Sequence, residues 1–145
     1  MSEQLITTVR LKLEKDMIFK CDMGNMKVKE CYIDETNEEE FDMWGPNPSK
    51  LLASAVLGCM SASLVFCVGK KGLKFDDFEA EAEYVAERNE KGFWRVKEIN
   101  VRLKPTTNDE SVFKRLKQCE KFFEDYCVIT QSVRQGITVN AQLDY

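Results

Sequence analysis

The chain has 145 residues, a formal net charge of −4, six cysteines and no histidine. Its length suits one domain or one protomer of an intertwined oligomer, and a composition of 43% hydrophobic and 32% charged residues is typical of a globular protein. The missing histidine excludes Ser-His-Asp or Cys-His-Asn catalysis within the chain, and also zinc sites that need a histidine ligand.

The N-terminal part of the chain predicts three strands and a loop. Residues 3–14 alternate polar and apolar side chains, as a half-buried strand does. A second apolar run, 17–19, leads through Gly24-Asn25 into a third run, 26–33. Because glycine and asparagine tolerate a positive φ, strands two and three should form a hairpin. The acidic stretch 34–40 that follows is predicted to be a solvated loop.

Proline and glycine residues at 45–49 mark the start of a long helix. Pro48 suits the first turn of a helix and Asn47 suits its N-cap. We expect the helix to run from Ser49 to Lys71, with Gly72 closing it. Since the helix is apolar on nearly every face, it should be buried on nearly every face. A sheet would cover one side, and a partner subunit can supply the second surface.

The second half of the chain predicts a long hairpin followed by helices. Two alternating segments, 78–84 and 93–103, are separated by a loop at 89–92 that is rich in turn-forming residues. Helical spacing then extends from about 112 to 126. At Cys127 the sequence indicates either a second short helix or a kinked continuation of the first.

The chain is predicted to end in a strand, after Gly136 stops the last helix. Ile137, Val139, Ala141 and Leu143 give this strand its apolar face. The resulting order, βββ-α-ββ-αα-β, indicates an α+β fold with antiparallel sheets. We interpret residues 1–145 as a single domain, with an N-terminal β-meander and acidic loop at 1–44 and a helix-containing core at 45–145.

Membrane insertion, secretion and nucleic-acid binding are not expected. The longest apolar stretch, 51–68, is interrupted by serines and a glycine, which fits a buried core helix better than a membrane span. The N-terminus lacks the basic region and apolar core of a secretory signal. Basic and acidic residues are interleaved rather than clustered, so no nucleic-acid-binding face stands out. These features predict a cytoplasmic protein whose cysteines are reduced thiols by default.

The cysteine spacing does not indicate a metal site. No two cysteines form a Cys-x-x-Cys motif, so neither a zinc knuckle nor a thioredoxin-like site is predicted. The three adjacent carboxylates Glu38-Glu39-Glu40 cannot converge on one ion without other ligands, and we expect no metal. Four of the cysteines read as packing residues; these are Cys21, Cys31, Cys67 and Cys119.

Cys59 and Cys127 differ from the other cysteines in their surroundings. Cys59 lies among small residues that let another element approach the helix closely. Cys127 lies at the junction of two helical pieces, where a helix N-terminus favours a thiolate. Composition alone still favours a structural role for both.

Two segments resemble motifs of the OsmC/Ohr family. Residues 45–59, which read Gly-Pro-Asn-Pro-Ser-Lys-Leu-Leu-Ala-Ser-Ala-Val-Leu-Gly-Cys, resemble its Pro-x-x-Leu-Leu…Cys signature. Residues 126–129, followed by 137–139, are similar to its second-cysteine helix and closing strand. The order of elements also matches over almost the whole chain.

The resemblance implies an intertwined α+β homodimer whose long helices pack centrally and whose cysteine pair lies at the dimer interface. Cys59 would be the peroxidatic thiol that attacks an organic hydroperoxide and becomes a sulfenic acid. Cys127 would be the resolving thiol, and an external dithiol would reduce the resulting disulfide. This chemistry needs no metal and no other cofactor.

The sequence departs from the family pattern around the thiol. Family peroxidases place a glutamate just after the Asn-Pro of the helix start and an arginine in the preceding segment. Ser49, followed by Lys50, stands at the glutamate position, and residues 36–44 contain no arginine. Lys50, Arg10 or Lys20 can substitute as a nearby charge, and Trp44 precedes the helix beside the presumed site.

This departure leaves two functions open, so whether the protein is an enzyme is also open. One is a peroxidase in which Arg10, Trp44, Ser49 and Lys50 contact the substrate near the two cysteines. The other is a dimeric binding protein that holds a hydrophobic or thiol-bearing metabolite in the interface cleft.

Overall fold

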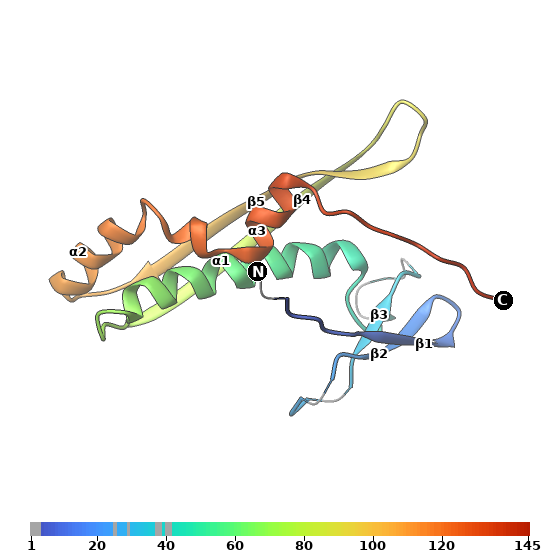
Figure 1. The fold of residues 1–145 in the computed structure, drawn as a ribbon, viewed down its shortest axis with the longest axis horizontal. Coiled ribbons are helices and arrows are strands. Elements are labelled where there is room, and N and C mark those ends of the chain that lie inside the picture. Colours follow the sequence, from blue (N-terminus) through green and yellow to red (C-terminus); the bar gives the residue numbers. More distant parts are fainter. Residues whose placement is uncertain (1–3, 25, 29, 37–38, 40–41) are drawn as a thin grey trace. The chain divides into compact units, whose positions relative to one another are not determined.

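The computed structural model describes residues 4–24, 26–28, 30–36, 39 and 42–145, and it divides into two compact units, 1–51 and 52–145. The predicted α+β class with antiparallel sheets is confirmed (Figure 1). In chain order the elements are β1 (Arg10–Lys15), β2 (Ile18–Asp22), β3 (Tyr32–Asp34), α1 (Pro48–Gly69), β4 (Asp77–Arg88), β5 (Trp94–Thr106), α2 (Glu110–Cys119), the 3-10 helix η2 (Phe123–Tyr126) and α3 (Val128–Gln135).

The first unit holds the antiparallel sheet β1-β2-β3, which is smaller than the sequence predicts. Strand β1 begins only at Arg10, and Leu5 and Ile6, which precede it, are 99% and 86% exposed and pair with no strand among the described residues. The predicted β2–β3 hairpin is present, with Ile18 opposite Asp34, but β3 is only three residues long. Glu3 and Asn25, which belong to these predicted segments, lie outside the described residues.

The prediction of a solvated acidic loop is wrong for Asp34, which is fully buried at the end of β3. Its carboxylate accepts hydrogen bonds from the Thr36 hydroxyl at 2.6 Å, the Thr36 N–H at 2.9 Å and the Trp44 N–H at 2.9 Å. These hydrogen bonds, of which the one from the Thr36 side chain has the largest effect, outweigh the desolvation of the carboxylate and lower the pKa of Asp34. Residues 37, 38 and 40 of the predicted loop lie outside the described residues.

The charge on Asp34 should make the first unit sensitive to acid. The pKa of Asp34 in the folded protein lies below the unfolded value of about 3.9. The stabilisation that its charge gives the folded state is therefore complete above that pH and is lost as the pH falls through the folded pKa. We expect Asp34→Asn to lower the thermal midpoint at pH 7, and the difference from wild type to shrink in acid. Circular dichroism melting curves across this range measure it, and a difference that does not change with pH would contradict the assignment.

Helix α1 begins as predicted, since the Lys50 N–H donates to the Asn47 side chain at 2.8 Å. It ends at Gly69 rather than Lys71, and Gly72 follows with a φ of +70°. The expectation of burial on nearly every face is wrong for the single chain, because Val65 and Phe66 are 49% and 55% exposed. By length and composition alone, α1 could cross a membrane. The core helices of soluble proteins also meet these two criteria.

The second unit contains the predicted long hairpin, β4–β5. The two strands are antiparallel, and their paired residues extend from Asp77 opposite Thr106 to Arg88 opposite Trp94. One irregularity in the register lies between Val85 and Ala86. The Asn89 side chain closes the loop by accepting hydrogen bonds from the N–H groups of Lys91 and Phe93 at 3.0 Å each.

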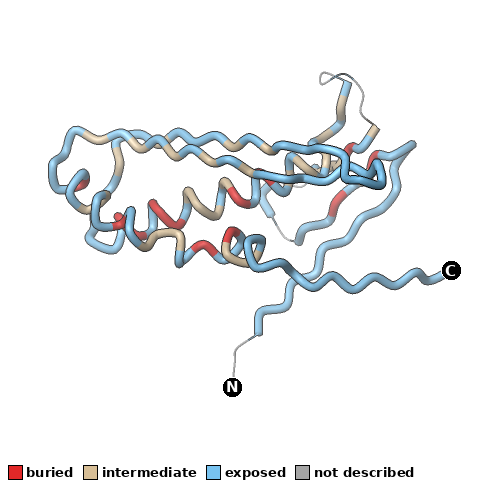
Figure 2. Tube along the Cα trace, turned by 90° about the horizontal axis from the view of Figure 1, so that it is seen from above, coloured by how far each residue is buried: buried red, intermediate tan, exposed pale blue. Residues whose placement is uncertain are grey.

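The core of the second unit is built on the C-terminal half of α1 and on α2 (Figure 2). Its fully or nearly fully buried members are Leu64, Cys67, Val68, Val112 and Cys119. The prediction that Cys67 and Cys119 only pack is corrected, since a disulfide joins them with their Cα atoms 6.0 Å apart. The two residues are 52 positions apart, so only the packing of α2 on α1 brings them together.

The predicted final strand is absent, and residues 136–145 extend from α3 without a strand partner (Figure 1). The apolar positions of this segment are largely exposed, with Ile137 at 62%, Val139 at 84% and Leu143 at 82%. Alternation predicts which side chains share a face, but a strand also needs a neighbour to bond its backbone. No strand in the described part of the chain pairs with this segment.

Candidate functional site

The structure brings the side chains of Cys59 and Cys127 into contact, although the two lie in different helical segments. Cys59 is part of α1, and Cys127 is the N-cap residue of α3, directly after η2. Both are free thiols; Cys59 is half-buried and Cys127 is fully buried. The sequence left open whether Cys127 starts a new helix, and the extended backbone at this residue shows that it does.

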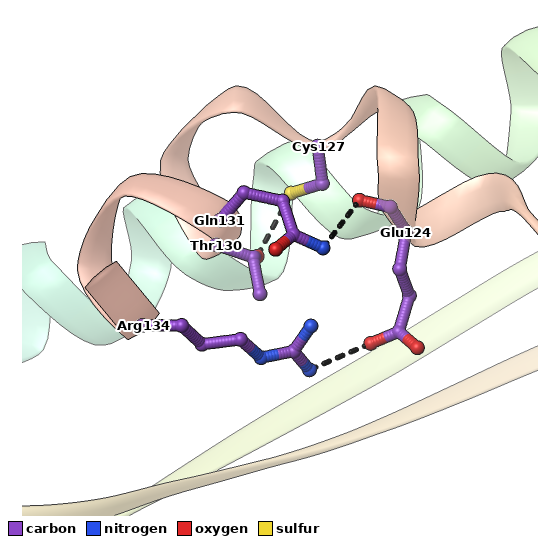
Figure 3. Close-up of polar contacts among 5 residues, drawn as sticks. All are labelled: Glu124, Cys127, Thr130, Gln131 and Arg134. Carbon is purple, nitrogen blue, oxygen red and sulfur yellow. Dashed lines mark hydrogen bonds and ion pairs between the residues drawn. The ribbon is translucent and has the colours of Figure 1, made fainter.

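The surroundings of Cys127 favour its thiolate. Burial by itself raises the pKa of this thiol, but hydrogen bonds from the Thr130 side chain, Cys59 and Ser63 outweigh burial and lower it. The strongest contact is with Thr130, whose Oγ1 lies 2.8 Å from Cys127 Sγ (Figure 3). Thr130 is itself buried, so water competes little for this hydrogen bond.

The surroundings of Cys59 favour its protonated form. Burial raises the pKa of Cys59, and the interaction with Cys127 raises it further. The backbone N–H groups of Ile129 and Thr130, at the start of α3, oppose this effect without reversing it. The two thiols therefore share their protons unequally, because Cys127 loses its proton at a lower pH than Cys59 does. The groups that set this distribution are thiols, hydroxyls and backbone amides.

A cavity of about 360 Å³ has Thr130, the hydrogen-bond partner of Cys127, in its wall, and neither Cys59 nor Cys127 lines it. One part of its wall is apolar and the other is polar. Its lining residues are Val56, Met60, Ile99, Asn100, Val101, Glu124, Thr130, Val133 and Arg134. Thr130 connects the cavity to the thiols, because its Oγ1 contacts the sulfur of Cys127, and Met60 of the lining follows Cys59 in α1.

An ion pair between Arg134 and Glu124 forms the charged part of this cavity (Figure 3). Arg134 Nη2 lies 2.7 Å from Glu124 Oε1, and Gln131 Nε2 donates to the Glu124 backbone carbonyl at 3.2 Å. Sequence reasoning missed these residues, together with Thr130. They flank Cys127 by only a few positions, but their convergence depends on the break between η2 and α3.

Removing the Thr130 hydroxyl should raise the pKa of Cys127. Valine keeps the shape of threonine but donates no hydrogen bond, and a lost hydrogen bond to a charged group should cut the thiolate fraction at neutral pH by roughly tenfold. The ultraviolet absorbance of the thiolate, followed against pH, measures this effect in Thr130→Val. Ser132→Ala, on the same helix, is the control and should titrate like wild type; equal titration of all three proteins would refute the role of Thr130.

The four residues predicted to bind substrate all belong to the first unit, whereas both cysteines belong to the second. Ser49 and Lys50 occupy the first turn of α1, and Arg10 begins β1 opposite Asp22. Trp44 packs edge-on against Tyr32, with ring centroids 5.3 Å apart. The role of these four residues in binding substrate stays a prediction. Among the described residues, no group of three or more cysteine, aspartate or glutamate side chains is placed to hold a metal ion.

Comparisons with known proteins agree on one fold. The family model described as "OsmC-like protein" matches residues 37–142. An OsmC-like protein from Mycoplasma pneumoniae is 15% identical, with a TM-score of 0.70, and the match covers 91% of this chain and 89% of that one. A hypothetical protein from Aquifex aeolicus is 21% identical, with a TM-score of 0.67 and the same coverage.

A third similar structure is the organic hydroperoxide resistance protein OhrB of Bacillus subtilis. It is 17% identical, with a TM-score of 0.61, and the match covers 90% of this chain and 91% of that one. At these identities the likeness concerns the fold. A comparison with curated protein sequences finds no match.

Proposed function

Because the chain belongs to the OsmC-like protein family, we propose that it is a thiol peroxidase that reduces organic hydroperoxides through Cys59 and Cys127. The observation that carries this proposal is the contact between these two free thiols, which shifts their pKa values in opposite directions. Two similar structures, from Bacillus subtilis and Legionella pneumophila, are described as organic hydroperoxide resistance proteins.

The two sulfurs differ in solvent exposure and in acidity, and this difference suggests which of them reacts first. Cys127 is the better thiolate but is fully buried, whereas half-buried Cys59 is open to a substrate. We therefore assign the attack to Cys59, with Cys127 as the base that accepts its proton. In this way the pair generates a nucleophile without the histidine that thiol catalysis often uses.

The reaction then proceeds in two balanced steps. The Cys59 thiolate attacks the terminal peroxide oxygen, the O–O bond breaks, and the leaving alkoxide takes the proton from Cys127 to become an alcohol. Cys59 is now a sulfenic acid and Cys127 is again a thiolate. The Cys127 thiolate attacks the Cys59 sulfur and releases hydroxide, which leaves a disulfide for an external dithiol to reduce.

The cavity beside Thr130 is the proposed substrate pocket. Its valine, isoleucine and methionine side chains suit the organic part of a hydroperoxide, and the Arg134–Glu124 ion pair offers polar contacts to the peroxide end. In this proposal the ion pair takes over the positioning role that the family gives to its own arginine and glutamate. Arginine suits this role because its guanidinium presents several N–H donors in a fixed geometry.

We also propose that the protein works as a cytoplasmic homodimer, as OsmC-like proteins are soluble. The exposed side of α1, with Val65 and Phe66, and the apolar tail, with Ile137 and Val139, leave large apolar side chains in solvent, and exposed apolar patches mark interaction sites. A second copy that covers α1 and pairs with the tail would bury both. Light scattering after gel filtration should give twice the chain mass of 16.8 kDa.

A single-turnover experiment tests the peroxidase. Wild-type protein with Cys59 and Cys127 as free thiols and the Cys67–Cys119 disulfide intact is mixed with cumene hydroperoxide, and the products are analysed by mass spectrometry after free thiols are blocked. We expect one cumyl alcohol per chain and a peptide link between Cys59 and Cys127. A protein that leaves the peroxide intact, or one that consumes it without forming this link, would rule the proposal out.

The alternative of a metabolite-binding protein is favoured by a second cavity, of about 450 Å³ and mostly apolar, between the end of α1 and the start of β4. Leu73, Phe75 and Phe78 are among the residues that line it. Its lining includes neither a described cysteine nor Thr130, so binding there would be independent of thiol chemistry. Thermal shifts with apolar ligands in a protein that does not reduce hydroperoxides would favour this function.

A further inference from the structure

A second pair of thiols lies in the first unit, on the hairpin formed by β2 and β3. The ladder places Lys20 opposite Tyr32, so the next residues, Cys21 and Cys31, face each other directly. The Cys21 N–H donates to the Cys31 carbonyl at 2.8 Å, which fixes this register. Both cysteines are free, and neither takes part in the chemistry proposed for Cys59 and Cys127.

Facing residues of an antiparallel pair meet the geometric requirement for a disulfide. Their Cα atoms are about 4.5–5.5 Å apart, and disulfides span about 4.4–6.8 Å. Their side chains also leave the sheet on the same face, so the two sulfurs approach each other without a change in the backbone. Burial and the neighbouring Cys31 thiol raise the pKa of Cys21 to about 11, which is consistent with two thiols in close contact.

We propose that Cys21 and Cys31 form a second dithiol site, which reacts with low-molecular-weight disulfides of the glutathione type and closes into a cross-strand disulfide. The unequal burial of the two residues sets the order of the steps. Cys21 is buried, with 6% of its surface exposed, whereas Cys31 is only partly buried. Cys31 is therefore the sulfur that an external disulfide reaches first.

The external disulfide is the only oxidant that this exchange needs. Cys31, as its thiolate, attacks one sulfur of the external disulfide and forms a mixed disulfide, while the first thiol leaves. Cys21 then gives up its proton and attacks the Cys31 sulfur, and the second thiol leaves with that proton. The external disulfide is reduced to two thiols, and the two protein thiols are oxidised to one disulfide.

The test uses the full chain carrying Cys59→Ser and Cys127→Ser. Because Cys67 and Cys119 are bonded to each other, Cys21 and Cys31 are the two thiols left free in this variant. After incubation with oxidised glutathione, we expect the chain to lose two hydrogen masses, carry no glutathione, and yield a peptide link between Cys21 and Cys31. Unreacted thiols, a stable glutathione adduct or a link between two chains would each overturn the proposal.

A matched variant shows whether the two cysteines act together. Adding Cys21→Ser to the same background removes the resolving sulfur, so the reaction should stop at a glutathione adduct on Cys31. If the variants fold poorly, the same peptide link can be sought in wild-type protein, where it is separate from any Cys59–Cys127 link. Its absence there, after oxidation by glutathione disulfide, would equally overturn the proposal. Since no hydroperoxide is used, this result does not depend on the peroxidase activity.

Discussion

Cys59→Ser is expected to abolish hydroperoxide reduction, with a loss of roughly 10³-fold or more in the rate of the first step. The reason is that a serine hydroxyl in the same place is not a nucleophile towards the O–O bond, and removing the nucleophile disables the catalytic unit as a whole. Stopped-flow mixing with cumene hydroperoxide, followed by detection of the alcohol, measures this loss. Cys21→Ser, on the other unit, is the control and should react at the wild-type rate.

Cys127→Ser should separate attack from resolution. Without Cys127 the first step loses its base and slows, but Cys59 can still be oxidised, and its sulfenic acid then persists because no second thiol condenses with it. A sulfenic acid probe should therefore label Cys59 in this variant and label little in wild type. If the probe instead labels Cys127 in the Cys59→Ser protein, the two roles are reversed.

The pH dependence of the attack follows from the same pair. The pKa of Cys127 is lowered and that of Cys59 is raised, so one negative charge is shared over a pH range between the two. The first step should thus rise with pH as Cys127 loses its proton, and Thr130→Val should move this rise to higher pH.

The parts of the fold that depend on neighbouring residues could be predicted from the sequence. Asn47 caps α1 and Asn89 closes the β4–β5 loop because each bonds to backbone groups a few positions away. The contact between Cys59 and Cys127 agrees with the pairing implied by the family motifs. Sequence position does not reveal which sulfur holds the proton, because the hydrogen bonds of Thr130 and Ser63 decide it.

The parts that depend on distant partners could not be predicted. Asp34 reads as the start of an acidic loop, yet donors at Thr36 and Trp44 let it be buried as a carboxylate. Alternation at residues 137–143 predicts a strand, but a strand requires a neighbour, and none of the described strands pairs with this segment. The Cys67–Cys119 disulfide joins two helix ends, and no local pattern marks either cysteine.

That disulfide should be the largest single contribution to stability that one pair of substitutions can remove. The two cysteines are 52 positions apart, and closing a loop of this length restricts the unfolded chain enough to stabilise the fold by about 4 kcal/mol. Both residues are fully buried in the core, so small molecules reach the bond only when the fold opens. Burial therefore protects the bond from reduction by external thiols while the chain is folded.

The double variant Cys67→Ala/Cys119→Ala should therefore unfold at a much lower guanidinium concentration than wild type. The contacts of Arg115 with the Cys67 carbonyl, at 3.0 and 3.2 Å, involve the backbone and are retained, and only the longer contact of Arg115 with the Cys67 sulfur, at 3.7 Å, is lost with the bond. Cys21→Ala is the control for removing a buried sulfur that is not bonded. Because the unlinked chain expands more on unfolding, the slope of the transition should also increase. A double variant within about 1 kcal/mol of the control would mean that the cross-link adds little beyond the packing of α2 on α1.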